Sequence, residues 1–149
     1  MRRKSLAALA LVAVLALGGA ASAQGLGSLR SWAGKYPTER RGRVTRSFFR
    51  VPAVQRPLAA TLSRKDLNLL TRVYNVETPI KALGDYLAVK VCMPHNCDTE
   101  QAGFAINLRT GNVYVRMKEG SEVRWFASEG DYTDLPANVQ DYLNDFSAT

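Results

Sequence analysis

The chain has 149 residues, of which 46% are hydrophobic, and it carries 20 lysines and arginines against 13 acidic residues, a formal net charge of +7. This length and apolar content suit one domain whose hydrophobic core does not depend on disulfides. Two cysteines and one histidine in total exclude a scaffold of several disulfides.

The N-terminus has the pattern of a cleavable secretory signal. Three basic residues at positions 2–4 precede an unbroken apolar run over residues 6–17, and small residues follow up to Ala23. The apolar run is shorter than the roughly 20 residues of a membrane-spanning helix. We therefore predict a signal peptide over residues 1–23 and no transmembrane segment after its cleavage. Cleavage would leave 17 basic and 13 acidic residues, a net charge of +4.

The next segment, residues 24–57, is rich in arginine and is expected to be part of the domain or attached to it. Leu29, Trp32 and Tyr36 stand three and four residues apart, which predicts a short helical face. Five arginines then lie between residues 40 and 50. Such charge runs are usually solvated, and an anionic surface is the functional alternative. We expect no nucleic-acid partner, because the aromatic and fold motifs of nucleic-acid-binding proteins are missing.

Residues 58–149 are predicted to form the main α+β domain. Apolar residues follow a helical period from Leu58 to Tyr74, and Ser63 with Asp66 can cap a second helix within that stretch. From Tyr86 the period changes to the alternation of strands, with glycine-containing turns between them, and a last helix follows Pro136. The predicted fold is an antiparallel β-sheet, a meander, with flanking helices packed on one face.

Both cysteines and the only histidine lie in the hexapeptide CMPHNC, residues 92–97, between two predicted strands. In an oxidising compartment, this pair of cysteines indicates one local disulfide, Cys92–Cys97. Pro94 fixes its own φ and restricts Met93, so His95 at the tip has few conformations to lose. The hexapeptide is therefore predicted to be a preorganised loop that presents an imidazole.

Other interpretations of this loop stay open. The disulfide could serve only to stabilise a hairpin, with a histidine that has no role. It could also be redox-active, although C-x-x-C at a helix N-terminus is the usual redox pattern. A zinc site has too few ligands within so short a span, and the histidine does not directly follow C-x-x-C as haem attachment requires.

Elsewhere the chain shows no catalytic constellation. Asp131 and Asp134 near Tyr132, and Glu119 with Glu122, are carboxylate pairs without a visible pocket, and turns are usually acidic for solvation alone. We therefore predict no enzymatic activity, no catalytic residue, no cofactor and no metal.

The C-x-P-H-x-C loop, in an exported α+β domain of this size, resembles the periplasmic inhibitors of vertebrate lysozyme from Gram-negative bacteria, whose loop reads C-K-P-H-D-C. Cys92, Pro94, His95 and Cys97 match this motif, while Met93 replaces a lysine and Asn96 an aspartate. The resemblance extends roughly over residues 86–117 and leaves residues 24–75 uncovered.

This resemblance implies a periplasmic protein with bridged cysteines and a lysozyme-binding loop formed by Met93, Pro94, His95 and Asn96. It assigns to His95 hydrogen bonds to both catalytic carboxylates of the target. The predicted partner is lysozyme or another muramidase, and a homodimer is left open. Vertebrate lysozymes are themselves basic, so long-range attraction would not steer a +4 inhibitor toward them, and a different muramidase is an option.

The alternative function is a cell-envelope binding module without enzymatic activity. Such a module would hold peptidoglycan or an anionic polymer through its arginines and Trp32 or Trp125. The alternation of its strand places Trp125 together with Val123, which favours a core position for both residues.

Overall fold

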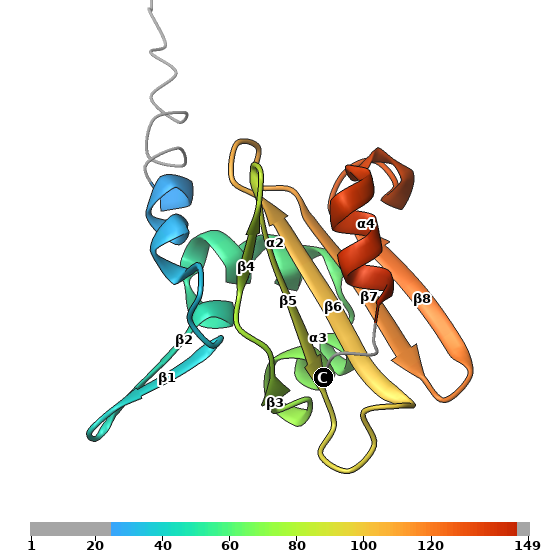
Figure 1. The fold of residues 1–149 in the computed structure, drawn as a ribbon, viewed down its shortest axis with the longest axis horizontal. Coiled ribbons are helices and arrows are strands. Elements are labelled where there is room, and N and C mark those ends of the chain that lie inside the picture. The colour runs from blue at the N-terminus through green and yellow to red at the C-terminus, as the bar shows by residue number, and fades with distance from the viewer. Residues whose placement is uncertain (1–24, 146–149) are drawn as a thin grey trace, which may run out of the picture.

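The computed structural model describes residues 25–145, so the predicted signal peptide lies outside the described residues. Its centre is a six-stranded antiparallel sheet with the order β3-β5-β6-β7-β8, in which β4 also pairs with β5 (Figure 1). The strands are β3 (Val76–Glu77), β4 (Lys81–Leu83), β5 (Tyr86–Cys92), β6 (Glu100–Asn107), β7 (Val113–Glu119) and β8 (Glu122–Ala127).

Strands β5 to β8 follow one another as a meander, as the alternating pattern predicted. The register joins Val89 to Phe104 and Phe104 to Val115, and Val115 pairs with Phe126 of β8. Gly120 adopts a positive φ of 61° in the two-residue turn between β7 and β8. A glycine is favoured there because it alone enters the left-handed region without a Cβ clash.

Most of the helical structure lies before the sheet in the chain. Ser63 begins α3 as the sequence indicated, because its Oγ accepts a hydrogen bond from the Asp66 N–H at 3.1 Å. The helical segments are η1 (Leu29–Trp32), η2 (Phe48–Arg50), α2 (Pro52–Thr61), α3 (Arg64–Asn68), η3 (Leu69–Val73), η4 (Tyr132–Asp134) and α4 (Ala137–Asn144). None of the helices within residues 25–145 is long and apolar enough to cross a membrane.

The antiparallel α+β fold is confirmed, but helices cover both faces of the sheet and not one (Figure 1). Val89 and Phe104 belong to a main core beneath the N-terminal helices, whereas Ala88 and Ala105 face a second cluster built with Leu143 of α4. Every residue of β5 is buried. Because successive residues of a strand point to opposite faces, such a strand needs cover on both sides.

Residues 25–57 supply much of the main core. Leu29, Trp32, Phe48 and Phe49 are buried, and the two phenylalanine rings pack edge-on against Phe104 of β6 at centroid distances of 6.1 and 5.7 Å. These contacts explain why a segment with so many arginines folds onto the sheet, since burying each aromatic ring contributes on the order of 2–3 kcal/mol.

The arginine-rich part of this segment forms a hairpin that projects from the body (Figure 1). Strands β1 (Thr38–Arg41) and β2 (Val44–Ser47) pair only with each other, as a separate two-stranded sheet. Tyr36, just before β1, is 52% exposed, so the apolar face predicted from Leu29 to Tyr36 ends at Trp32.

Candidate functional site

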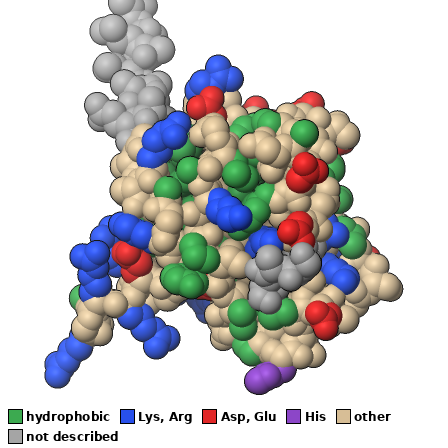
Figure 2. All heavy atoms as spheres, viewed as in Figure 1, with side chains coloured by type: hydrophobic (Ala, Val, Ile, Leu, Met, Phe, Trp, Pro, Cys, Tyr) green, Lys and Arg blue, Asp and Glu red, His purple; other side chains and the backbone are tan. Residues whose placement is uncertain are grey.

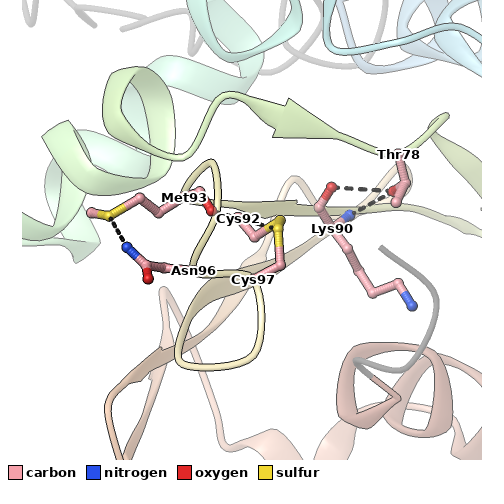
Figure 3. Close-up of a disulfide and its surroundings, with 6 residues drawn as sticks. All are labelled: Thr78, Lys90, Cys92, Met93, Asn96 and Cys97. Atoms are coloured by element: carbon pink, nitrogen blue, oxygen red, sulfur yellow. Dashed lines mark hydrogen bonds between the residues drawn. A yellow bond between two sulfur atoms is a disulfide. The ribbon is translucent and has the colours of Figure 1, made fainter.

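The connection between β5 and β6 is closed at its base by a covalent and a hydrogen bond. Cys92, the fully buried last residue of β5, forms a disulfide with Cys97, and their Cα atoms lie 5.0 Å apart (Figure 3). The Met93 N–H donates a hydrogen bond to the Glu100 carbonyl at 2.9 Å. The disulfide predicted from the sequence is therefore present, and the hydrogen bond from Met93 continues the pairing of β5 with β6 one residue beyond the end of β5.

Within the ring, residues 93–96 form a β-turn. The Asn96 N–H donates to the Met93 carbonyl at 3.0 Å, which places Pro94 and His95 at the two central positions. His95 has a φ of +66° and is the only non-glycine residue between 25 and 145 with a positive φ. Proline followed by a residue with positive φ is the pattern of a type II turn, in which the second central position usually belongs to glycine or asparagine. A histidine there stores backbone strain.

Two of the four side chains in the turn are half-buried and two are exposed. Met93 is half-buried and packs against the main core, and its Sδ accepts a hydrogen bond from the Asn96 Nδ2 at 3.5 Å (Figure 3). His95 and Asn96 are exposed, with Pro94 half-buried between anchor and tip. Figure 2 shows the histidine side chain standing out at the edge of the molecule. The turn thus holds its tip to the body through Met93.

The far side of the loop is fixed to the turn between β7 and β8. Gly120 N–H donates to the Thr99 carbonyl at 2.9 Å and to Glu100 Oε1 at 3.2 Å. The Lys118 ammonium donates to the Asp98 carbonyl at 2.5 Å. The return of the chain to β6 is therefore bound to a neighbouring turn at three points, which limits the movement of the loop.

A polar network also joins this end of the sheet to the helices. The Tyr74 hydroxyl donates to Glu100 Oε2 at 3.0 Å, and burial together with this carboxylate raises the pKa of Tyr74, so the tyrosine stays a protonated donor. Arg124 of β8 donates to Asp66 of α3 at 2.8 Å and holds the pKa of that carboxyl below its usual value. Lys65 likewise lowers the pKa of Glu119 through a hydrogen bond of 2.8 Å.

Sequence reasoning missed these supports. The partners are 26 residues apart in the Tyr74–Glu100 contact and 58 residues apart in the Asp66–Arg124 contact. No pattern of residues close in the sequence predicts such contacts. The positive φ of His95 could have been predicted from the sequence, because a proline at the preceding position indicates a type II turn, in which the next residue has a positive φ.

The acidic pairs considered as catalytic candidates form local turn structure. Asp131 Oδ1 accepts from the Thr133 N–H at 3.0 Å, and Asp134 Oδ2 accepts from the Asp131 N–H at 2.7 Å, which caps η4. Glu119 is engaged by Lys65, and the side chain of Glu122 is 70% exposed. Within residues 25–145, no three histidine, cysteine or acidic side chains are grouped so that they could hold a metal ion.

Neither tryptophan presents a free ring. Trp32 is buried in the main core, and half-buried Trp125 stacks on Tyr132 with a centroid distance of 3.6 Å. Val123 is 41% exposed, so the expectation of a core position fails for this valine, because its side chain lies beyond the cover that α4 gives to the sheet.

Comparison with known proteins bears on the loop and on the fold around it. A family model described as Inhibitor of vertebrate lysozyme (Ivy) matches residues 53–149, a range that contains the six-stranded sheet, α2 from its second residue, α3, α4 and the disulfide loop. No curated protein and no solved structure matches the chain. Since the family model matches well over half of the sequence, this protein belongs to the family of inhibitors of vertebrate lysozyme.

Proposed function

We propose that this chain is a periplasmic inhibitor of a lysozyme-type muramidase and that it acts by inserting the loop of residues 92–97 into the catalytic cleft of the target. Family membership supports the inhibitor function. The insertion is supported mainly by one observation: an exposed histidine is held at a positive φ at the tip of a disulfide-closed turn.

The chemistry of a muramidase cleft suits an imidazole. A lysozyme-type site keeps one carboxylic acid protonated and a second carboxylate ionised. The two ring nitrogens of His95 can engage both groups at once, and the hydrogen bonds become stronger if the imidazole is charged. Inhibition then requires no reaction by the inhibitor, only occlusion of the cleft and capture of the catalytic pair.

The strained backbone of the turn favours binding through preorganisation. A non-glycine residue in the left-handed region costs roughly 1–2 kcal/mol, and here that cost is met when the chain folds. The loop therefore loses little further freedom when it enters a cleft, which is how rigid inhibitor loops gain affinity.

The two positions that depart from the family motif form one contact. Asn96 donates to the sulfur of Met93, and Met93 in turn packs against the core. We infer that Met93 and Asn96 support binding by holding the loop against the core, whereas the lysine and aspartate of the family motif would contribute charge at the edge of the interface.

The test is a cell-wall lysis assay against a panel of muramidases with wild type and His95→Gly. Glycine accepts the positive φ and removes only the imidazole, so the turn should persist. A central buried anchor costs about 2 kcal/mol or more when truncated, which corresponds to roughly thirtyfold weaker inhibition. Met93→Lys with Asn96→Asp should improve inhibition of vertebrate lysozyme, because it restores the residues of the family motif.

Arg109→Ala is the matched control, since Arg109 lies at the other end of β6 and its side chain is 79% exposed. This control should inhibit like wild type. If wild type inhibits no muramidase of the panel, or if His95→Gly inhibits as well as wild type, the proposed function is wrong.

A further inference from the structure

A large hollow lies between η2, α2 and the α3–η3 segment, and no residue of the loop 92–97 lines it. Its volume is about 1010 Å³, close to the upper end of the range for small-molecule sites. A second hollow of about 600 Å³ adjoins it, since Phe49, Thr71 and Arg72 line both. The smaller hollow is also lined by Arg40 of β1 in the projecting hairpin, and we refer to the two neighbouring hollows together as one groove.

The charge of this groove is almost entirely positive. Arg50, Arg64, Lys65 and Arg72 line the larger hollow, and no acidic residue of the described chain lines it. Within residues 25–145, no carboxylate pairs with Arg50, Arg64 or Arg72. Like charges confined to one concave surface raise the local potential and concentrate anions there.

The single carboxylate of the smaller hollow does not offset this charge within the larger one. Glu77 accepts two hydrogen bonds from Thr38, from its hydroxyl at 2.7 Å and from its N–H at 3.1 Å. This residue therefore fastens β1 to β3. Among the described residues, Arg50, Arg64 and Arg72 keep no carboxylate partner, whereas Lys65 is paired with Glu119 at 2.8 Å.

We infer that this groove, hereafter the arginine groove, binds an anionic polysaccharide whose acidic groups pair with Arg50, Arg64 and Arg72. Planar guanidinium groups match phosphate, sulfate and carboxylate oxygens with two parallel hydrogen bonds. The exposed guanidinium groups are supplied by three different elements, η2, α3 and η3, around one hollow, so a ligand with several acidic groups can pair with more than one of them.

The neutral lining favours a sugar chain over other polyanions. Gln55, Asn68 and Thr71 line the same hollow as the arginines, and their amide and hydroxyl groups both donate and accept hydrogen bonds, as sugar hydroxyls require. Phe49, the one aromatic ring in the larger hollow, is 4% exposed and offers no platform on which a nucleic-acid base could stack.

This inference goes beyond the proposed inhibition and does not depend on it. A muramidase inhibitor that also holds an anionic polysaccharide would be retained where its target acts. The projecting hairpin carries further basic side chains beside the groove, which Figure 2 shows along its length, and these would extend the same field toward a long polymer.

The experiment measures binding of the purified protein to fluorescent dextran sulfate at physiological ionic strength, with uncharged dextran, poly-L-glutamate and single-stranded DNA as comparison ligands. The groove variant is Arg64→Gln with Arg72→Gln. Its control is Arg56→Gln with Arg109→Gln, which has the same net charge and changes two exposed arginines outside both hollows and outside the hairpin.

Wild type should bind dextran sulfate and not dextran, and the groove variant should bind at least about tenfold more weakly. The control should stay within about twofold of wild type, with binding that weakens as salt rises. Equal losses in both variants, or no binding by wild type, would overturn the inference. Equally tight and groove-dependent binding of poly-L-glutamate or DNA would overturn the assignment to a polysaccharide. Muramidase inhibition by the groove variant should equal that of wild type, so the two proposals can fail separately.

Discussion

Opening the disulfide ring should weaken inhibition while the domain stays folded. The variant is Cys92→Ala with Cys97→Ser, because Cys92 is fully buried and a serine hydroxyl there would lack a partner, whereas Cys97 is only half-buried. The ring closes over a sequence separation of five residues. For so short a ring, the chain-entropy relation gives a stabilisation of about 2 kcal/mol at 25 °C.

The effect on inhibition follows from the backbone of His95. Once the bridge is removed, the hydrogen bond from Asn96 to Met93 and the strand pairing at Glu100 remain, but a single hydrogen bond contributes only about 1 kcal/mol net. This barely balances the roughly 1–2 kcal/mol cost of a histidine at positive φ. The open loop should therefore spend roughly half to five-sixths of the time outside the presenting conformation, and inhibition should weaken by roughly two- to sixfold.

Two measurements separate the effects. Urea unfolding should show a cooperative transition with an unchanged slope and a free energy of unfolding lower by about 2 kcal/mol. The lysis assay, run where both proteins are fully folded, should show the loss of inhibition. A variant that no longer unfolds cooperatively would show that the bridge holds the fold, and a variant that inhibits like wild type would refute the reasoning about the strained turn.

Two further predictions concern the scaffold. Gly103→Ala should lower the free energy of unfolding by about 1–3 kcal/mol in a urea titration, because a Cβ there would lie 2.9 Å from the Cδ2 of Leu143 on α4. Gly27→Ala is the control, since the space around Gly27 is open, and it should cost nothing measurable in the same titration. Arg124→Gln should cost about 1–3 kcal/mol at pH 7 and progressively less as the pH falls below 3.8. The pKa of Asp66 in the folded protein is lowered, so its ion pair stabilises the fold fully above 3.8 and is lost as the pH falls through the lowered pKa; a cost that does not change between pH 7 and acid would contradict this account.

Much of the fold could be predicted from the sequence because its signals are local. Alternating apolar residues around Phe104 and Val115 depend only on the two-residue period of a strand, and the capping of α3 by Ser63 involves residues three apart. The loop is local as well: the pairing of Cys92 with Cys97 follows from their spacing in an oxidising compartment. The family, too, was recognisable from this hexapeptide.

Tertiary structure decided what depends on distant partners. Alternation shows that a strand has two faces but not what covers the second one, and only the packing of Leu143 against Gly103 places α4 there. The Tyr74–Glu100 contact, which steadies the loop, joins segments that are far apart in the sequence, and so does the arginine groove. No periodic pattern in the sequence predicts that these segments come together. The chain's local chemistry thus determined which residues are presented, whereas long-range packing determined the direction and the rigidity with which they are held, because those contacts form only when the whole core closes.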